Sequence, residues 1–282
     1  MRILITGGAG LLGSELIARA PAGVELHATQ RRTPVTGAEV HAVELSDADA
    51  TGALFERLRP DLVIHTAYSQ AAETAERDVL RATESVVDVC RRVGCELVHV
   101  STDAVFDGEH APYAENDEPA PVHAYGRWKA AAERFVRNRL PSATVVRTSL
   151  IVRADPPDGG SAWVIDGLRR GEPVRLFVDE LRCPIAVEDL ASQLWELASV
   201  PAESRAGAWH LAGPEAVSRY TLGILLARRH GVDADAIIPT RSLGAGLQRP
   251  RDLRLLTPRA DRELRTRARP ISEVLLTTPT DR

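Results

Sequence analysis

The first half of the chain alternates short apolar runs with longer stretches in which apolar residues recur at helical spacing. Short apolar runs rich in β-branched residues predict buried strands, and a period of about 3.6 residues predicts amphipathic helices. Strands and helices that alternate in this way form parallel βαβ units. The predicted strands are 2–6, 24–29, 40–45, 62–66, 97–101 and 143–148, and the predicted helices are 11–19, 47–58, 71–93 and 124–140.

The second half of the chain lacks this regular alternation. Residues 155–160 are rich in proline and glycine and predict a loop. The segments that follow predict helices at 162–170, 187–198 and 220–230, and strands at 174–178 and 208–211. We therefore predict an α/β protein with a doubly wound parallel sheet over residues 1–150 and a smaller lobe over residues 151–282, part of which can return to the sheet. Ligands of such sheets bind at the carboxyl ends of the strands.

Composition and charge exclude several classes of function. The chain has 282 residues, 44% of them hydrophobic and 26% charged, which is typical of a soluble globular protein. A formal net charge of −4 offers no basic surface for nucleic acid or a membrane. No apolar run approaches the roughly 20 residues that span a bilayer, and the N-terminus does not resemble a signal peptide. With three cysteines at no framework spacing, we expect a cytoplasmic protein with reduced, buried thiols.

Glycines join the first predicted strand to the first predicted helix. Gly8, Gly10 and Gly13 fit G-x-G-x-x-G, and Gly7 with Gly10 and Gly13 fits G-x-x-G-x-x-G. Glycines at such a turn let the backbone approach a pyrophosphate, whose charge the helix N-terminus stabilises. The motif follows a strand and opens a helix, which is the context that a dinucleotide site requires. The loop therefore predicts a dinucleotide cofactor.

The end of the second predicted strand indicates which cofactor binds. A site for NAD(H) has an acidic residue here to hold the ribose 2′-hydroxyl, whereas this chain has Gln30, Arg31 and Arg32. Two guanidinium groups suit a 2′-phosphate because they form charge-assisted hydrogen bonds with it. We therefore predict NADP(H), the alternative being two surface arginines in an arginine-rich chain.

Tyr125 and Lys129 carry the candidate chemistry. They are four residues apart on a predicted helix and so share one face, and Lys129 is the only lysine in the chain. Reduction of a carbonyl needs a proton at the oxygen, and a phenol donates it best at neutral pH if its pKa is lowered. We expect the Lys129 ammonium to lower the pKa of Tyr125 and to bind the nicotinamide ribose, a role for a compact, rotatable donor. The alternative is a surface lysine beside a half-buried tyrosine.

A third polar group is expected to orient the carbonyl. The fifth predicted strand runs into Ser101, Thr102 and Asp103, at the edge of the sheet where ligands bind. We predict that Thr102 orients the substrate oxygen, with Ser101 as the second choice. Hydride would then pass from nicotinamide C4 to the carbonyl carbon while Tyr125 supplies the proton. Ordinary capping at the strand end is the alternative for these hydroxyls.

Together these residues resemble the extended short-chain dehydrogenases/reductases, whose cofactor domain has the Rossmann fold. Within them the chain is similar to the dTDP-4-dehydrorhamnose reductase family. The resemblance spans nearly the whole chain. It rests on the glycine loop, on Tyr125 with Lys129, and on the segments 59–68, 101–108, 147–149, 183–185, 189–191, 249–250 and 253–255.

The resemblance implies a substrate and further site residues. The family reduces nucleotide-linked 4-keto sugars with NADPH, and the resemblance makes residues 1–150 the NADP(H)-binding domain and residues 151–282 mainly the substrate-binding lobe. It also allows a homodimer. It places the pyrophosphate against Leu11 and Leu12, the adenine against Glu44 and Leu45, and the nicotinamide ribose against Thr66, Ala67 and Tyr68, and Ser101 is also expected to bind the cofactor. The sugar nucleotide is expected against Asp103 and Ala104, and Arg182 is a candidate for its phosphates, the alternative being one more surface arginine.

Three departures from the family pattern leave the substrate open. Ala104 stands where relatives commonly have tyrosine, Leu150 lies near a usual tryptophan, and Glu44 replaces an aspartate. The chain also resembles the regulatory subunit of methionine adenosyltransferase, so a non-catalytic NADP(H)-binding subunit is one alternative. A dehydrogenase or epimerase acting on another substrate is a second. No histidine, cysteine and carboxylate cluster has metal-ligand spacing, so the sequence predicts no metal site.

Overall fold

The computed structural model describes residues 1–68, 76–243 and 249–277. Its centre is a seven-stranded parallel sheet in the order β11-β6-β5-β4-β1-β2-β3. This confirms the α/β doubly wound fold. The strands are β1 (Arg2–Thr6), β2 (Glu25–Gln30), β3 (Glu39–Ala42), β4 (Leu62–His65), β5 (Glu96–Thr102), β6 (Thr144–Thr148) and β11 (Gly207–Leu211).

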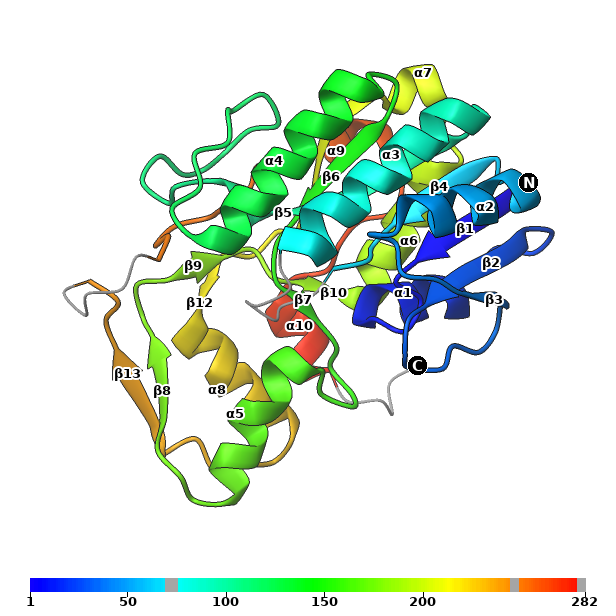
Figure 1. Ribbon diagram of the computed structural model, residues 1–282. Coiled ribbons are helices and arrows are strands. Elements are labelled where there is room, and N and C mark those ends of the chain that lie inside the picture. The colour runs from blue at the N-terminus through cyan, green and yellow to red at the C-terminus, as the bar shows by residue number, and fades with distance from the viewer. Residues whose placement is uncertain (69–75, 244–248, 278–282) are drawn as a thin grey trace.

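Helices cover both faces of the sheet (Figure 1). Successive side chains of β1 divide between the two faces, because Ile3 and Ile5 belong to one buried cluster and Leu4 to the other. The first cluster is closed by α1 (Leu11–Ala18) and α6 (Val187–Ala198), and the second by α2 (Ala48–Leu58), α3 (Ala82–Val93) and α4 (Ala124–Arg139).

The predicted elements of the first half form with shifts of a few residues at their ends. Asp47 caps α2, since its carboxylate accepts hydrogen bonds from the amides of Asp49 and Ala50, and Gly94 ends α3 in the left-handed conformation. The predicted helix 71–93 starts outside the described residues. Its described part is a π-helical turn, η1 (Glu76–Arg81), that continues into α3.

Part of the second half belongs to the main sheet. Strand β11 pairs with β6, and α6 packs against α1. The remaining elements form a lobe beside the sheet in which α5 (Gly159–Arg169) and α8 (Arg219–Arg229) pack together, and β8 (Val174–Phe177) pairs with β13 (Ile237–Thr240) (Figure 1). The shorter elements are η2 (Asp103–Val105), β7 (Ile151–Val152), β9 (Leu181–Arg182), β10 (Ile185–Ala186), α7 (Ala202–Arg205), β12 (Val217–Ser218), α9 (Pro258–Glu263) and α10 (Ile271–Leu276).

Cys90, Cys95 and Cys183 are all buried, and none forms a disulfide. None of the helices within the described residues is long and apolar enough to cross a membrane.

Candidate active site

A cavity of about 870 Å³ opens at the carboxyl ends of the central strands. It lies where β1 and β4 neighbour each other, the point at which the strand order reverses and ligands of this architecture bind. Every residue that the sequence predicts for the cofactor lines it, as do the three predicted catalytic residues. These residues are Gly7, Gly10, Leu11, Leu12, Gly13, Arg31, Arg32, Glu44, Leu45, Thr66, Ala67, Tyr68, Ser101, Thr102, Tyr125 and Lys129.

The glycine loop has the geometry that a pyrophosphate needs. Gly7 has a φ of +73°, and a Cβ on Gly13 would lie 2.2 Å from the carbonyl oxygen of Gly7. Only glycine therefore allows α1 to start so close to β1. Gly10 is the N-cap of α1 and makes no side-chain cap, so the first amides of the helix are available to an anion. Gly8 instead faces Ala28 and the packed interior, which makes Gly7, Gly10 and Gly13 the set that faces the cavity.

Arg31 and Arg32 both line the cavity. One guanidinium nitrogen of Arg31 is 3.0 Å from a carboxylate oxygen of Asp78 and 3.5 Å from one of Glu44. The hydrogen bond that Arg31 donates to Asp78 is the main reason why the pKa of Arg31 is raised. These carboxylates orient Arg31, whereas the side chain of Arg32 is exposed at the cavity wall. Asp78 is a lining residue that the sequence did not single out.

The N-terminus of α4 presents Tyr125 to the cavity. His123 caps the helix by accepting a hydrogen bond from the amide of Gly126. A Cβ on Gly126 would lie 2.2 Å from the carbonyl oxygen of Ala104, so glycine lets α4 pack directly against η2, which follows β5. The ring of Tyr125 is 6.1 Å from that of Tyr68, centroid to centroid. This packing brings the Tyr125 phenol beside Thr102.

The electrostatic environment of Tyr125 differs from the one that we expected. Burial raises the pKa of Tyr125, Tyr68 and Asp103 raise it further, and only the hydrogen bond with Thr102 lowers it. The Lys129 ammonium instead donates to the carbonyl oxygen of Val100 at 2.7 Å. The expected lowering by Lys129 is therefore not seen, because its charge is directed to the backbone of β5. Tyr125 stays protonated at neutral pH, the form that a proton donor requires.

Lys129 is a buried cation close to two neutral histidines. Burial lowers the pKa of Lys129 to about 8, and Glu133 opposes this shift. The rings of His65 and His99 stack on each other with their centroids 5.4 Å apart. Burial and the charge of Lys129 lower the pKa of His65 to about 3 and also lower that of His99. Both histidines are therefore neutral, so Lys129 is the cation on this side of the site.

The pKa of Lys129 predicts how stability depends on pH. An unfolded chain keeps this proton up to about pH 10.5, whereas the folded chain releases it near pH 8. Between these values the unfolded state binds more protons, so the Lys129 contribution to the free energy of unfolding rises with pH. Urea unfolding without cofactor at pH 7.5 and 9.5 is expected to give a smaller rise for Lys129→Met than for the wild type. Equal slopes for the two proteins would refute this assignment.

The hydroxyls of Ser101 and Thr102 have different surroundings. Ser101 donates to the buried carboxylate of Glu133, which also forms an ion pair with Arg147. Thr102 accepts a hydrogen bond from the amide of Ala104 and lies within hydrogen-bonding reach of Tyr125. Thr102 is therefore the better placed of the two to hold a substrate oxygen beside the phenol, while Ser101 is held by its contact with Glu133.

Of the three residues predicted for the substrate, only Asp103 lines the cavity. Its carboxylate accepts a hydrogen bond from Ser149 at 2.7 Å and lies 3.7 Å from Arg182. Ala104 is buried in an apolar cluster under the cavity floor. Arg182 is 5% exposed and donates to the carbonyl oxygens of Leu181 and Pro250, so its guanidinium is engaged inside the protein.

A different arginine, Arg219 at the start of α8, lines the cavity instead. Burial, and the nearby charge of Arg182, lower the pKa of Arg219 to about 10, so it remains a cation at neutral pH. Its nearest acidic group is Glu180, 3.8 Å away, which is also paired with Arg249. Residues 158–160 at the N-terminus of α5 also line the cavity. Sequence spacing carried no signal for Arg219, because it belongs to an irregular part of the chain.

The chain matches a known protein family over almost its whole length. The model of the family described as the RmlD substrate binding domain matches residues 1–278. The chain belongs to this family. A probable low-salt glycan biosynthesis reductase, Agl14, of Haloferax volcanii is 31% identical over 264 residues, which cover 89% of this chain and 86% of the relative. The dTDP-4-dehydrorhamnose reductase of Mycobacterium tuberculosis is 33% identical over 257 residues, covering 86% and 79%.

The relatives of this chain also include a protein of another kind. The methionine adenosyltransferase 2 subunit beta of Danio rerio is 27% identical over 223 residues, which cover 75% of this chain and 69% of that protein. The family relationship therefore makes the chain a homologue of NAD(P)-dependent sugar-nucleotide reductases and of this subunit.

Solved structures share the whole fold. A hypothetical dTDP-4-dehydrorhamnose reductase from Sulfolobus tokodaii has a TM-score of 0.83 at 28% identity, covering 95% of this chain and 97% of that one. The dTDP-4-dehydrorhamnose reductase of Bacillus anthracis, in complex with NADP, has a TM-score of 0.85 at 21% identity, covering 97% and 96%. At that identity the second structure supports the fold alone.

Proposed function

We propose that this chain catalyses the NADPH-dependent reduction of the keto group of a nucleotide-linked 4-keto deoxysugar. The observation that carries the proposal is the meeting of Tyr125, Thr102 and Lys129 in the same cavity as the glycine loop. A carbonyl reductase needs a proton donor, a group that orients the carbonyl and a dinucleotide cradle within one site. Membership of the RmlD family supports this reaction class.

Each residue of the site has a distinct part in the proposed reaction. NADPH, when bound, supplies the hydride that reaches the carbonyl carbon. Tyr125 donates its phenolic proton to the carbonyl oxygen, which becomes the hydroxyl of the product. Thr102 holds that oxygen beside the phenol, and the buried Lys129 offers its remaining ammonium protons to the ribose of the cofactor. Tyr125 recovers its proton from solvent through the open end of the cavity.

Substitution of the two arginines that follow β2 tests the preference for NADPH over NADH. Arg31→Ala/Arg32→Ala is expected to weaken NADPH binding about 10²- to 10⁴-fold, because each of the two charge-assisted hydrogen bonds that it removes contributes about 1.5–3 kcal/mol. Binding of NADH is expected to change little. Fluorescence titration of both cofactors measures this, with Arg92→Ala as the control, since Arg92 pairs with Glu56 away from the cavity. Equal losses for the two cofactors would contradict the preference for NADPH.

Arg219 supports a diphosphate in the substrate. It is a cation on the cavity wall, whereas the start of α5, which also lines the cavity, is capped by the carboxylate of Asp158. A nucleoside diphosphate joined to the sugar would place its phosphates against Arg219. In this account Arg219 takes the role that the sequence predicted for Arg182.

The test is consumption of NADPH with a panel of dTDP- and UDP-linked 4-keto-6-deoxy sugars. At least one is expected to be turned over, and Arg219→Gln is expected to raise its KM about 10-fold or more with a smaller change in kcat. Tight NADPH binding without turnover of any sugar would favour a regulatory subunit instead. The relative in Danio rerio and the replacement of the expected aromatic residues by Ala104 and Leu150 motivate that second candidate.

A further inference from the structure

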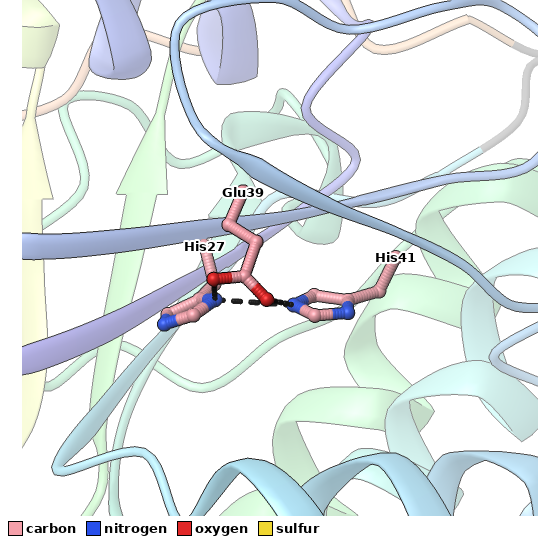
Figure 2. A group of neighbouring side chains, drawn as sticks. All are labelled: His27, Glu39 and His41. Atoms are coloured by element: carbon pink, nitrogen blue, oxygen red, sulfur yellow. Dashed lines mark hydrogen bonds and ion pairs between the residues drawn. The ribbon is translucent and has the colours of Figure 1, made fainter.

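Three potential metal ligands meet at one edge of the main sheet, outside the cavity. His27 lies on β2, and Glu39 and His41 lie on the edge strand β3. The register pairs His27 with Glu39, and His41 lies two residues further along β3, so all three side chains project from the same face. Figure 2 shows the carboxylate of Glu39 between the two imidazole rings. None of the three lines the cofactor cavity.

The distances among the donor groups of the three side chains lie close to those of tetrahedral coordination. The Nδ1 of His27 is 3.1 Å from the Nε2 of His41, and it is 3.7 Å from the Oε2 of Glu39. The Oε1 of Glu39 is 3.9 Å from the Nε2 of His41. Ligands about 2.0–2.1 Å from a tetrahedral Zn²⁺ are separated by about 3.3–3.4 Å. The two nitrogens and one carboxylate oxygen of Glu39 all lie within 4.8 Å of one another, so small side-chain rotations would let these three atoms bind one ion.

A neighbouring carboxylate prepares His27 for this role. The Nε2 of His27 is 3.2 Å from the Oε1 of Glu25, which also accepts a hydrogen bond from Arg2. If Nε2 carries the proton and donates it to Glu25, Nδ1 presents its lone pair toward His41 and Glu39. This arrangement, in which a carboxylate fixes the tautomer of a metal-binding histidine, is common in metal sites.

We propose that His27, Glu39 and His41 bind one divalent transition-metal ion of the Zn²⁺ type. His27 is buried and Glu39 is exposed, so the ion would be anchored on the protein side and would keep one position open to water. The ion would tie the short edge strand β3 to β2. The sequence predicted no metal site because His27 and Glu39 are far apart in the chain and only the register between the strands brings them together.

The test is titration of the chelator-treated full chain with ZnCl₂ by isothermal titration calorimetry. We expect one ion per chain, and we expect Zn²⁺ to raise the Tm of the wild type. Glu39→Gln is the primary variant because the side chain is 69% exposed, so the substitution leaves the packed interior intact. It is expected to lose Zn²⁺ affinity by more than 10-fold, as is His41→Gln, while Glu25→Gln is expected to lose about 10- to 100-fold.

His110→Gln is the matched control. His110 is an exposed histidine paired with the Asp107 carboxylate at 2.8 Å, so it tests whether any surface histidine beside a carboxylate binds the ion. Its Zn²⁺ affinity is expected to equal that of the wild type. The proposal is overturned if the wild type binds no stoichiometric Zn²⁺, or if binding and the rise in Tm survive both Glu39→Gln and His41→Gln. Because the readout is metal binding, the outcome is independent of the proposed reductase activity.

Discussion

Tyr125→Phe is expected to lower kcat about 10²- to 10⁴-fold, the usual contribution of a positioned proton donor. The affinity for NADPH is expected to stay close to that of the wild type, because the substitution keeps the ring that packs beside Tyr68 and removes only the hydroxyl. Steady-state rates with the best sugar of the panel, together with NADPH titrations, measure the two effects separately.

The hydroxyl of Tyr220 provides the control for Tyr125→Phe. Tyr220 lies on α8 outside the lining of the cavity, so Tyr220→Phe is expected to leave kcat and the affinity for NADPH unchanged. Turnover by Tyr125→Phe within about threefold of the wild-type rate would show that the proton comes from another group. Thr102→Ala would then identify whether the neighbouring hydroxyl is that group.

Glu133→Ala is expected to lower the free energy of unfolding by about 3–5 kcal/mol, the cost of leaving a buried charge without its partner. The side chains of Glu133 and Arg147 are 0% and 1% exposed, and two guanidinium nitrogens of Arg147 contact the carboxylate at 2.9–3.2 Å. The Arg147 guanidinium also lies 4.9 Å from the centre of the Phe106 ring, so it cannot turn toward water without disrupting the apolar packing. Urea unfolding measures the loss.

The exposed pair of Asp88 and Arg139 is the matched control for this stability effect. Their closest N–O distance is also 2.9 Å, but their side chains are about half exposed. Solvent screens such a pair, so Asp88→Ala is expected to cost at most about 1 kcal/mol. If Glu133→Ala destabilises the protein no more than Asp88→Ala does, the buried charge of Arg147 does not depend on Glu133 for its stabilisation, and the prediction is wrong.

The sequence predicted the elements whose signals are local. The glycine loop carries its own turn chemistry, and Tyr125 with Lys129 needs only the helical period to share a face. The strands of the first half are apolar runs bounded by polar turns, so they could be located to within a few residues. Because parallel strands deliver their carboxyl ends to one edge, these local predictions were sufficient to gather the glycine loop, Thr102 and Tyr125 into one cavity.

What the sequence could not predict depends on contacts between distant segments. The sequence does not distinguish Arg182 from Arg219, since both are arginines at the ends of secondary-structure elements. Only the folded structure shows that Arg182 is buried against Pro250 and that Arg219 lines the cavity. The sequence does not show that β11 pairs with β6 for the same reason, since the two strands are far apart in the chain. The pKa of Tyr125 was also misjudged, because spacing on a helix does not show that Lys129 donates to the carbonyl of Val100 or that the phenol is buried.

The most direct measurement of the central claim is the fate of the hydride. The enzyme is incubated with NADPH deuterated at the transferred position of nicotinamide C4 and with the sugar nucleotide that supports turnover, and the product is examined by NMR. The account predicts one deuterium on C4 of the sugar, which becomes a CD–OH carbon as Tyr125 protonates the oxygen. Product without deuterium at C4, or deuterium on another carbon, would contradict reduction of a 4-keto sugar at this site.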